Sequence, residues 1–229
     1  MKSTLKCSLV AVFAILVGVV GQTASPLAAT AGAASPVVEV QGFGATYGEW
    51  SARWWQWALS IPAAVNPILD TTGANCAQGQ VDDVWFLGGT FGGTVTRSCT
   101  VPPGKPIFFP LINNIAFKPF GYETLLDLRS LAASFVDTVT VLQATIDGKA
   151  VQDLFKFRVR SSSFTVIAPP GGLLPPGWTN VPGNTDPLVS DGYWLLLSPL
   201  PAGQHVIHFH AETSGGFVLD VTYNLTIGP

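Results

Sequence analysis

Charged residues are scarce in this chain. Only 11% of its 229 residues are Asp, Glu, Lys or Arg, against a typical share of about 25%. Because the formal net charge is −3, the chain lacks the basic surface that attracts nucleic acid or anionic lipid. Hydrophobic residues make up 48% of the chain, which argues against disorder. We therefore expect a globular protein without a nucleic-acid partner.

Familiar signatures of catalysis are also missing. No Gly-x-Ser-x-Gly elbow presents a nucleophilic serine. The glycine-rich run 88–93 lacks the Gly-Lys-Ser/Thr ending of a phosphate-binding loop. The chain has three cysteines and three histidines, and no Cys-x-x-Cys pair. The sequence therefore leans against an enzyme.

The first 33 residues have the pattern of a secretory signal peptide. Lys2 and Lys6 form a basic start, and the apolar run 9–20 is too short to span a bilayer comfortably. Two Ala-x-Ala cleavage sites follow at 29–31 and 31–33; an uncleaved anchor is the alternative. No later stretch is apolar enough for a transmembrane helix. We expect a secreted or extracytoplasmic protein whose residues 34–229 form one domain.

Cleavage would remove Cys7 and leave the pair Cys76 and Cys99. In an oxidising compartment such a pair most simply forms a disulfide. Metal ligation and a catalytic thiol are disfavoured, because no histidine lies nearby in the sequence. The bridge would close a loop of roughly twenty residues and stabilise the fold by about 3 kcal/mol. We expect it to join the segment after the tryptophan-rich stretch to the following strands.

Residues 47–59 hold four of the seven tryptophans and predict an amphipathic helix. Thr46 and Glu49 have the spacing of a capping box at its start. Three indoles fall on one stripe at helical spacing: Trp50, Trp54 and Trp57. This stripe must dock on an apolar surface, whereas Trp55 points the other way.

The rest of the chain predicts a mainly β protein. Apolar or alternating runs, each bounded by turn signals, lie at 84–87, 94–101, 107–112, 139–146, 155–159, 193–197, 205–210 and 217–227. Residues 123–135 predict a second short helix. We expect an immunoglobulin-like or jelly-roll-like antiparallel β-sandwich. Residues 34–135 would form a helix-plus-strand half with the disulfide, and 136–229 a sandwich-like half.

A set of motifs runs through most of the mature chain. They are Cys76 to Gln80, Val84-Trp85-Phe86-Leu87, Cys99-Thr100-Val101-Pro102-x-Gly104-Lys105, Phe108-Phe109-Pro110, Ser190-Asp191-Gly192-Tyr193-Trp194 and Gly203-x-His205-x-Ile207-x-Phe209. Together they resemble a group of uncharacterised secreted bacterial proteins. The resemblance implies an exported β-rich fold and carries no activity.

Three side chains near the C-terminus suggest a metal site. His208, His210 and Glu212 would share one face of a strand, and imidazole and carboxylate groups bind zinc, copper or iron. The His-x-His pattern is similar to the metal strand of cupins, which however place the Glu further on and add a distant His. The alternative is a half-solvated strand whose outer face carries histidines. A metal is the only cofactor that the sequence suggests.

Aromatic residues outside the helical stripe suggest a binding surface. Trp55, Trp178 and Tyr193 are free to stack on sugar rings, because each ring offers an apolar face with a polar tip. Asn113, Asn114 and Asp191 would supply hydrogen bonds to such a ligand. Packing in the core is the alternative for these rings.

These observations favour a secreted, non-catalytic binding or envelope-associated protein. Its partner would be an extracellular glycan or another polymer. One alternative is a secreted metal-dependent enzyme or hydrolase that uses His208, His210 and Glu212. A second alternative is a structural module for protein–protein interaction.

Overall fold

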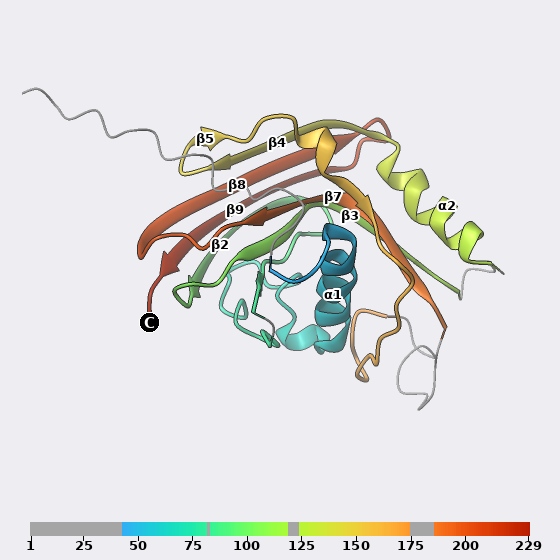
Figure 1. Ribbon diagram of the computed structural model, residues 1–229, viewed down its shortest axis with the longest axis horizontal. Coiled ribbons are helices and arrows are strands. Elements are labelled where there is room, and N and C mark those ends of the chain that lie inside the picture. Colours follow the sequence, from blue (N-terminus) through green and yellow to red (C-terminus); the bar gives the residue numbers. More distant parts are fainter. Residues whose placement is uncertain (1–42, 82, 119–123, 175–185) are drawn as a thin grey trace, which may run out of the picture. The chain divides into compact units, whose positions relative to one another are not determined.

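The computed structural model describes residues 43–81, 83–118, 124–174 and 186–229 (Figure 1). The chain divides into two units, Met1–Ala33 and Ala34–Pro229. The first unit, which contains the predicted signal peptide, lies outside the described residues. The predicted binding residue Trp178 lies outside them as well.

Two β-sheets form the framework of the second unit, and the protein is mainly β, as predicted. The four-stranded sheet has the order β1-β3-β7-β6, and the five-stranded sheet has the order β2-β9-β8-β4-β5. The strands are β1 (Trp85–Phe86), β2 (Gly93–Val101), β3 (Ile107–Phe117), β4 (Val139–Ile146), β5 (Lys149–Ala150), β6 (Arg158–Arg160), β7 (Leu188–Leu197), β8 (Gly203–Thr213) and β9 (Val218–Ile227). Phe109 of β3 meets Phe209 of β8 at 5.3 Å between ring centroids, so the two sheets pack in a sandwich-like arrangement.

Each sheet contains one parallel pair of strands, so the sandwich is not purely antiparallel. β1 pairs with β3, and β2 pairs with β9, both in parallel. These pairings cross the predicted division of the domain into two halves, because β2 and β3 join β9 and β7 of the other half. The two halves therefore share both sheets.

Helix α1 (Tyr47–Ser60) packs against β3, β6 and β7, on the face of the four-stranded sheet away from the five-stranded one (Figure 1). The predicted capping box is present, since Thr46 and Glu49 each bond the other's backbone. Trp54 lies edge-on to Trp194, which stacks on Phe108. Because β3 and β7 carry α1 on one face and the second sheet on the other, both are apolar along most of their length.

Trp55 is not left at the surface. Its side chain is only 5% exposed, and its ring meets that of Trp54 edge-on at 5.0 Å. The helical stripe defined by Trp50, Trp54 and Trp57 is thus narrower than the buried face, which takes in all four tryptophans of α1. The second helix, α2 (Leu125–Val136), packs on β3 and β7.

Several predicted strands differ in extent. The run 193–197, for example, begins earlier and starts at Leu188 as β7. The run 107–112 continues beyond its predicted end at Asn113 and reaches Phe117 as β3. Within 155–159, the residues Leu154–Phe157 instead form a 3-10 helix, and only Arg158–Arg160 pair as a strand. Leu154 and Phe157, three residues apart, are the buried pair, a spacing that suits a 3-10 turn.

Several local predictions are confirmed. Cys76 and Cys99 form a disulfide, which ties the loop after α1 to β2. Asp147 and Gly148 both have positive φ and turn β4 into β5. In the described part of the chain, no helix has the length and hydrophobicity to cross a membrane.

Arg97 of β2 is the one arginine buried among the described residues, at 1% exposure. Its guanidinium donates to the carbonyl oxygens of Ile68, Asp70, Gly88 and Gly89 and to the hydroxyl of Tyr223, at 2.6–3.0 Å. The hydroxyl group of Tyr223 in turn donates a hydrogen bond to the carbonyl oxygen of Gly88 at 2.9 Å. The planar guanidinium thus hydrogen-bonds backbone carbonyl groups of two loops, and these carbonyl groups lie outside the named strands.

Arg97→Lys should therefore destabilise the protein by roughly 2–4 kcal/mol, because one ammonium group cannot reach carbonyls on both loops. Arg129→Lys on the exposed surface of α2 is the matched control and should change stability by about 0.5 kcal/mol or less. Urea unfolding of the three proteins measures the difference. Equal stability of the two variants would contradict the bridging role of Arg97.

Tyr47 at the start of α1 is a second buried polar group. Burial raises its pKa to about 12, although the backbone N–H of Leu196 donates to its hydroxyl at 3.2 Å and opposes the rise. An unfolded tyrosine has a pKa of about 10. The folded state therefore holds this proton more tightly, and the stability it contributes is lost as the pH rises from 10 to 12.

Between pH 8 and pH 11 the ionisation of Tyr47 should cost about 1.4 kcal/mol of unfolding free energy. Tyr47→Phe should lose this part of the pH dependence while keeping the contribution of Tyr223, whose pKa burial also raises. Urea unfolding at both pH values, on both proteins, gives the comparison. A variant that loses as much stability as the parent over this range would refute the assignment.

Candidate functional site

A cavity of about 190 Å³ lies beside β3, where that strand meets α1 and the loop after β1. Its lining is mostly apolar and contains no Asp, Glu, His, Lys, Arg or Cys among the described residues. The lining residues are Trp54, Trp55, Ile68, Gly89, Thr90, Phe91, Pro110, Leu111, Ile112, Asn113, Asn114, Ile115, Phe135, Phe217 and Leu219. The cavity therefore collects residues from both sheets, both helices and three loops.

The cavity lies beside the part of β3 that no longer has β1 as a neighbouring strand. β1 pairs with β3 only as far as Phe108, after which β3 pairs among the named strands with β7 alone. Pro110 stands at this point, and a proline is tolerated there because it has no N–H to offer a neighbouring strand. The register with β7 also shifts between Pro110 and Ile112, and such irregularities often re-aim side chains near functional sites.

Two polar groups in the cavity wall lack a hydrogen bond. The amide nitrogen of Asn113 and the indole nitrogen of Trp55 are buried without a partner among the described residues. The other buried nitrogens in this state belong to Trp50, Trp85 and Trp194, none of which lines the cavity. An unpaired buried donor costs about 1–3 kcal/mol. Both nitrogens have less than 1 Å² of accessible surface, so they lie behind the cavity wall and are not open to it.

Gly192 makes room for Asn113. The two residues are paired across β3 and β7, so their side-chain positions lie on the same face of the sheet. A Cβ at position 192 would lie only 2.6 Å from the Cβ of Asn113 and 2.8 Å from the carbonyl oxygen of Ile112. A glycine at this position thus preserves the place of the asparagine in the cavity wall.

Aromatic rings form the side of the cavity nearest to solvent. Phe91 lines the cavity and is 63% exposed. Phe135 at the end of α2 and Phe217 before β9 meet edge-on, with 5.3 Å between ring centroids. Their contact brings a ring from α2 and a ring from the turn before β9 together in the cavity lining.

A second hollow lies over the outer side of α1. This groove of about 600 Å³ is bordered by Val81 and Ile167, which are 89% and 86% exposed. Two of its polar side chains are already bonded, since Gln56 donates to the Thr165 carbonyl and the Trp57 indole donates to the Gln78 carbonyl. The guanidinium of Arg53, which also borders the groove, lies over the Trp50 ring at 4.6 Å. The groove therefore has a weaker claim to specific recognition than the cavity beside β3.

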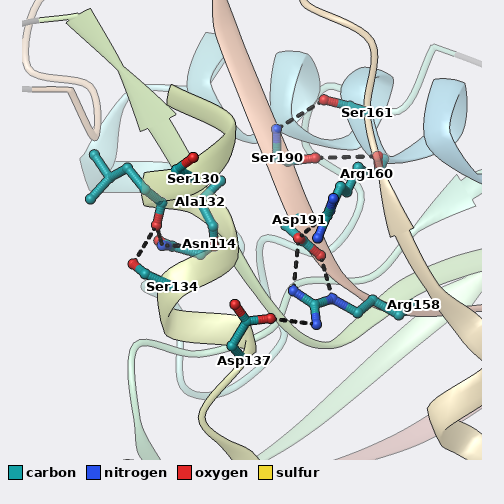
Figure 2. A network of polar contacts seen from close by, with 12 residues as sticks. Asn114, Ser130, Ala132, Ser134, Asp137, Arg158, Arg160, Ser161, Ser190 and Asp191 are labelled. Carbon is teal, nitrogen blue, oxygen red and sulfur yellow. Dashed lines mark hydrogen bonds and ion pairs between the residues drawn. The ribbon is translucent and has the colours of Figure 1, made fainter. Parts of the chain in front are cut away.

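Asp191 and Tyr193, both predicted to bind a ligand, do not line the cavity. Asp191 accepts two hydrogen bonds from Arg158 at 2.9 Å and one from Arg160 at 3.0 Å (Figure 2). The Asp191 carboxylate, followed by Asp137, raises the pKa of Arg158 above its ordinary value. Tyr193 is buried and packs edge-on against Phe155. Both side chains thus have structural partners.

The predicted metal ligands lie together but are bonded to carboxylates. His208 Nε2 and His210 Nδ1 approach the same oxygen of Asp220, at 3.2 and 3.1 Å. The second nitrogen of His210 lies 2.9 Å from Glu212. Over the described ranges, no group of three or more His, Cys, Asp or Glu side chains is arranged to hold a metal ion. The structure lends the metal hypothesis no support.

Comparison of the chain with protein-family models, curated proteins and solved structures finds no match. The resemblance to secreted bacterial proteins therefore stays a prediction.

The sequence pointed to part of this cavity. Trp55 and Asn113 were predicted as binding residues, and both line it. Phe91, Phe135 and Phe217 were missed, because they come from three separate segments that only the packed sandwich brings together. A polar residue inside an apolar strand was the available signal, but Asn113 was interpreted as the end of its strand.

Asp191→Asn tests the structural interpretation of that carboxylate. Losing the charge opposite two arginines should destabilise the protein by about 2 kcal/mol. Asp137→Asn is the matched control: this carboxylate also pairs with Arg158, at 2.7 Å, but its side chain is 59% exposed, so we expect a loss below about 1 kcal/mol. Urea unfolding measures the stability of both variants. An Asp191→Asn variant as stable as the parent protein would contradict the structural role of this carboxylate.

Proposed function

We propose that this protein is a non-catalytic binding protein that takes a small, largely apolar ligand into the cavity beside β3. The observation that supports the proposal is an apolar cavity of about 190 Å³, lined mainly by aromatic and aliphatic side chains, with the polar side chains of Thr90, Asn113 and Asn114 among them. Ligand sites in proteins have this character: apolar walls with a few polar groups that fix orientation.

The chemistry of the lining supports binding over catalysis. General acid–base work needs an ionisable side chain within hydrogen-bond reach of the substrate. The described lining residues include none, and the only hydroxyl among them, that of Thr90, already donates to the Gly92 carbonyl at 3.1 Å. The ion-paired residues Asp191 and Asp220 belong to other parts of the fold.

Cavity size indicates the class of ligand. A volume of 190 Å³ is somewhat larger than the roughly 150 Å³ apolar cavity that takes up benzene in an engineered protein. A sugar ring would bring several hydroxyl groups into a wall with few partners, and each unpaired hydroxyl costs free energy. We therefore favour a single-ring, mostly apolar compound over the glycan expected from the sequence.

The disulfide between Cys76 and Cys99 is compatible with an oxidising compartment. We keep secretion as part of the proposal on this ground and on the basic, apolar and small-residue pattern of residues 1–33. The protein would then meet its ligand outside the cytoplasm.

Toluene and α-methylstyrene test the proposal as apolar single-ring probes. At a concentration of about ten times Kd, a ligand that binds only the folded state adds about 1.4 kcal/mol, which corresponds to roughly 3–5 °C in Tm. Ile115→Trp places a large ring at the cavity wall and should abolish this rise. Val206→Trp, at an exposed position of β8 outside the cavity, is the control and should retain it.

A saturable rise in Tm that is lost in Ile115→Trp and kept in Val206→Trp would support the proposal. The absence of a rise with either probe, or an equal rise in both variants, would overturn it. Circular dichroism of each variant establishes that the fold is intact before ligand is added.

A further inference from the structure

We propose that the apolar ring held in this cavity belongs to an extended peptide, whose backbone pairs with the open edge of β3 as an added strand. The partner is then a peptide segment that carries a phenylalanine or a similar apolar ring. This inference rests on the proposed function, since the ring fills the same cavity, and it names the class of molecule that carries the ring.

The cavity lies at the edge of β3 and not over one of its faces. Its lining takes in the six consecutive residues 110–115, although successive residues of a strand face opposite ways. It also takes in Trp54 and Trp55 of α1, which covers one face of the four-stranded sheet, and Leu219 of β9, from the sheet on the other face (Figure 1). A single cavity touches all of these residues only if it runs along the edge of β3.

The backbone of β3 presents hydrogen-bonding groups to this edge. Ser190 of β7 turns its backbone towards β6, because its carbonyl oxygen accepts from the N–H of Ser161 and its own N–H donates to the Ser161 hydroxyl. The partner of Ser190 across the antiparallel pair is Ile115. In such a pair the two residues either bond each other or both turn away, so the N–H and C=O of Ile115 face the open edge.

Asn113 repeats this arrangement one step earlier along the strand. It lies two residues before Ile115, and the register with β7 is continuous between them. Because the direction of the backbone groups alternates along a strand, the N–H and C=O of Asn113 face the same edge. Within the described ranges these four groups have no backbone partner, since the bonds from the β1 side end with the one from the Leu87 N–H to the Phe108 carbonyl oxygen.

An extended peptide is the occupant that matches these groups. Donors and acceptors that recur at every second residue, about 7 Å apart, are what a neighbouring strand pairs with. β1 already pairs with this edge of β3 in parallel, and a peptide strand continues along the edge that β1 leaves. The described lining carries no charged side chain, which favours apolar side chains in the segment.

The pentapeptide acetyl-Thr-Val-Phe-Val-Thr-amide serves as the probe, and isothermal titration calorimetry measures its Kd with the unmodified protein. One analogue carries N-methyl groups on both valines, and a second carries them on the phenylalanine and the last threonine. Only alternate residues of an added strand face β3. One analogue should therefore bind about tenfold more weakly or worse, because its backbone hydrogen bonds are lost, and the other should bind as tightly as the unmethylated peptide.

Three controls locate the peptide at this cavity. Replacing its phenylalanine by alanine should weaken binding by about tenfold or more, because the ring is no longer buried. Ile115→Trp, which fills the cavity, should abolish binding of the pentapeptide. Val206→Trp, at an exposed position outside the cavity, should bind it as the parent protein does.

The outcomes separate this inference from the proposed function. If toluene binds the parent protein but the pentapeptide does not, or if the two N-methylated analogues bind alike, the strand inference is overturned while the binding function stands. Peptide binding that survives in Ile115→Trp would also overturn it. If neither toluene nor the peptide binds the parent protein, the proposed function fails as well.

A second copy of this chain is the other occupant that the experiments can reveal. Native mass spectrometry of the parent protein and of Ile115→Trp gives the comparison. A parent dimer that becomes a monomer in Ile115→Trp would assign the edge to a second copy and overturn the peptide as its partner. A monomer in both proteins is the result that the inference expects.

Discussion

The buried guanidinium of Arg97 is the interaction on which the loops of this protein depend. It hydrogen-bonds the carbonyl oxygens of Ile68, Asp70, Gly88 and Gly89 and the hydroxyl of Tyr223. Two of these residues, Ile68 and Gly89, also line the cavity. No carboxylate pairs with Arg97 among the described residues, so backbone dipoles offset its charge. The same five bonds that make the burial of a charge tolerable thus hold two walls of the candidate site in place.

On the face of the four-stranded sheet that α1 covers, packed aromatic rings support the wall of the cavity. α1 places Trp54 against Trp194, and Trp194 stacks on Phe108. The disulfide between Cys76 and Cys99 adds a covalent link from the loop after α1 to β2. Since β1 ends at Phe86, β3 continues without a strand partner on that side among the described residues, and the cavity lies beside it there.

The buried polar groups of the protein divide into those with and those without a hydrogen-bond partner among the described residues. The ion pairs around Asp191 and the histidine contacts around Asp220 are bonded within themselves. The donors of Asn113 and Trp55 are unpartnered and lie in an apolar wall. Because ligand sites are concave and mostly apolar with a few polar groups, the apolar cavity, and not these ion-paired clusters, is where we propose that a ligand binds.

Local sequence features determined local structure. The capping box of Thr46, the disulfide, the Asp147-Gly148 turn and the alternating strand that ends the chain were all predictable, because each depends on residues close in sequence or on the chemistry of a single pair. What the tertiary structure alone decided involves segments far apart: the parallel pairing of β2 with β9, the bonds of Arg97 and the burial of Trp55. An arginine on the inward row of β2 was a visible anomaly, but its carbonyl partners come from separate loops. The cavity likewise exists only where both helices and both sheets meet, and no periodicity in the sequence encodes such a meeting.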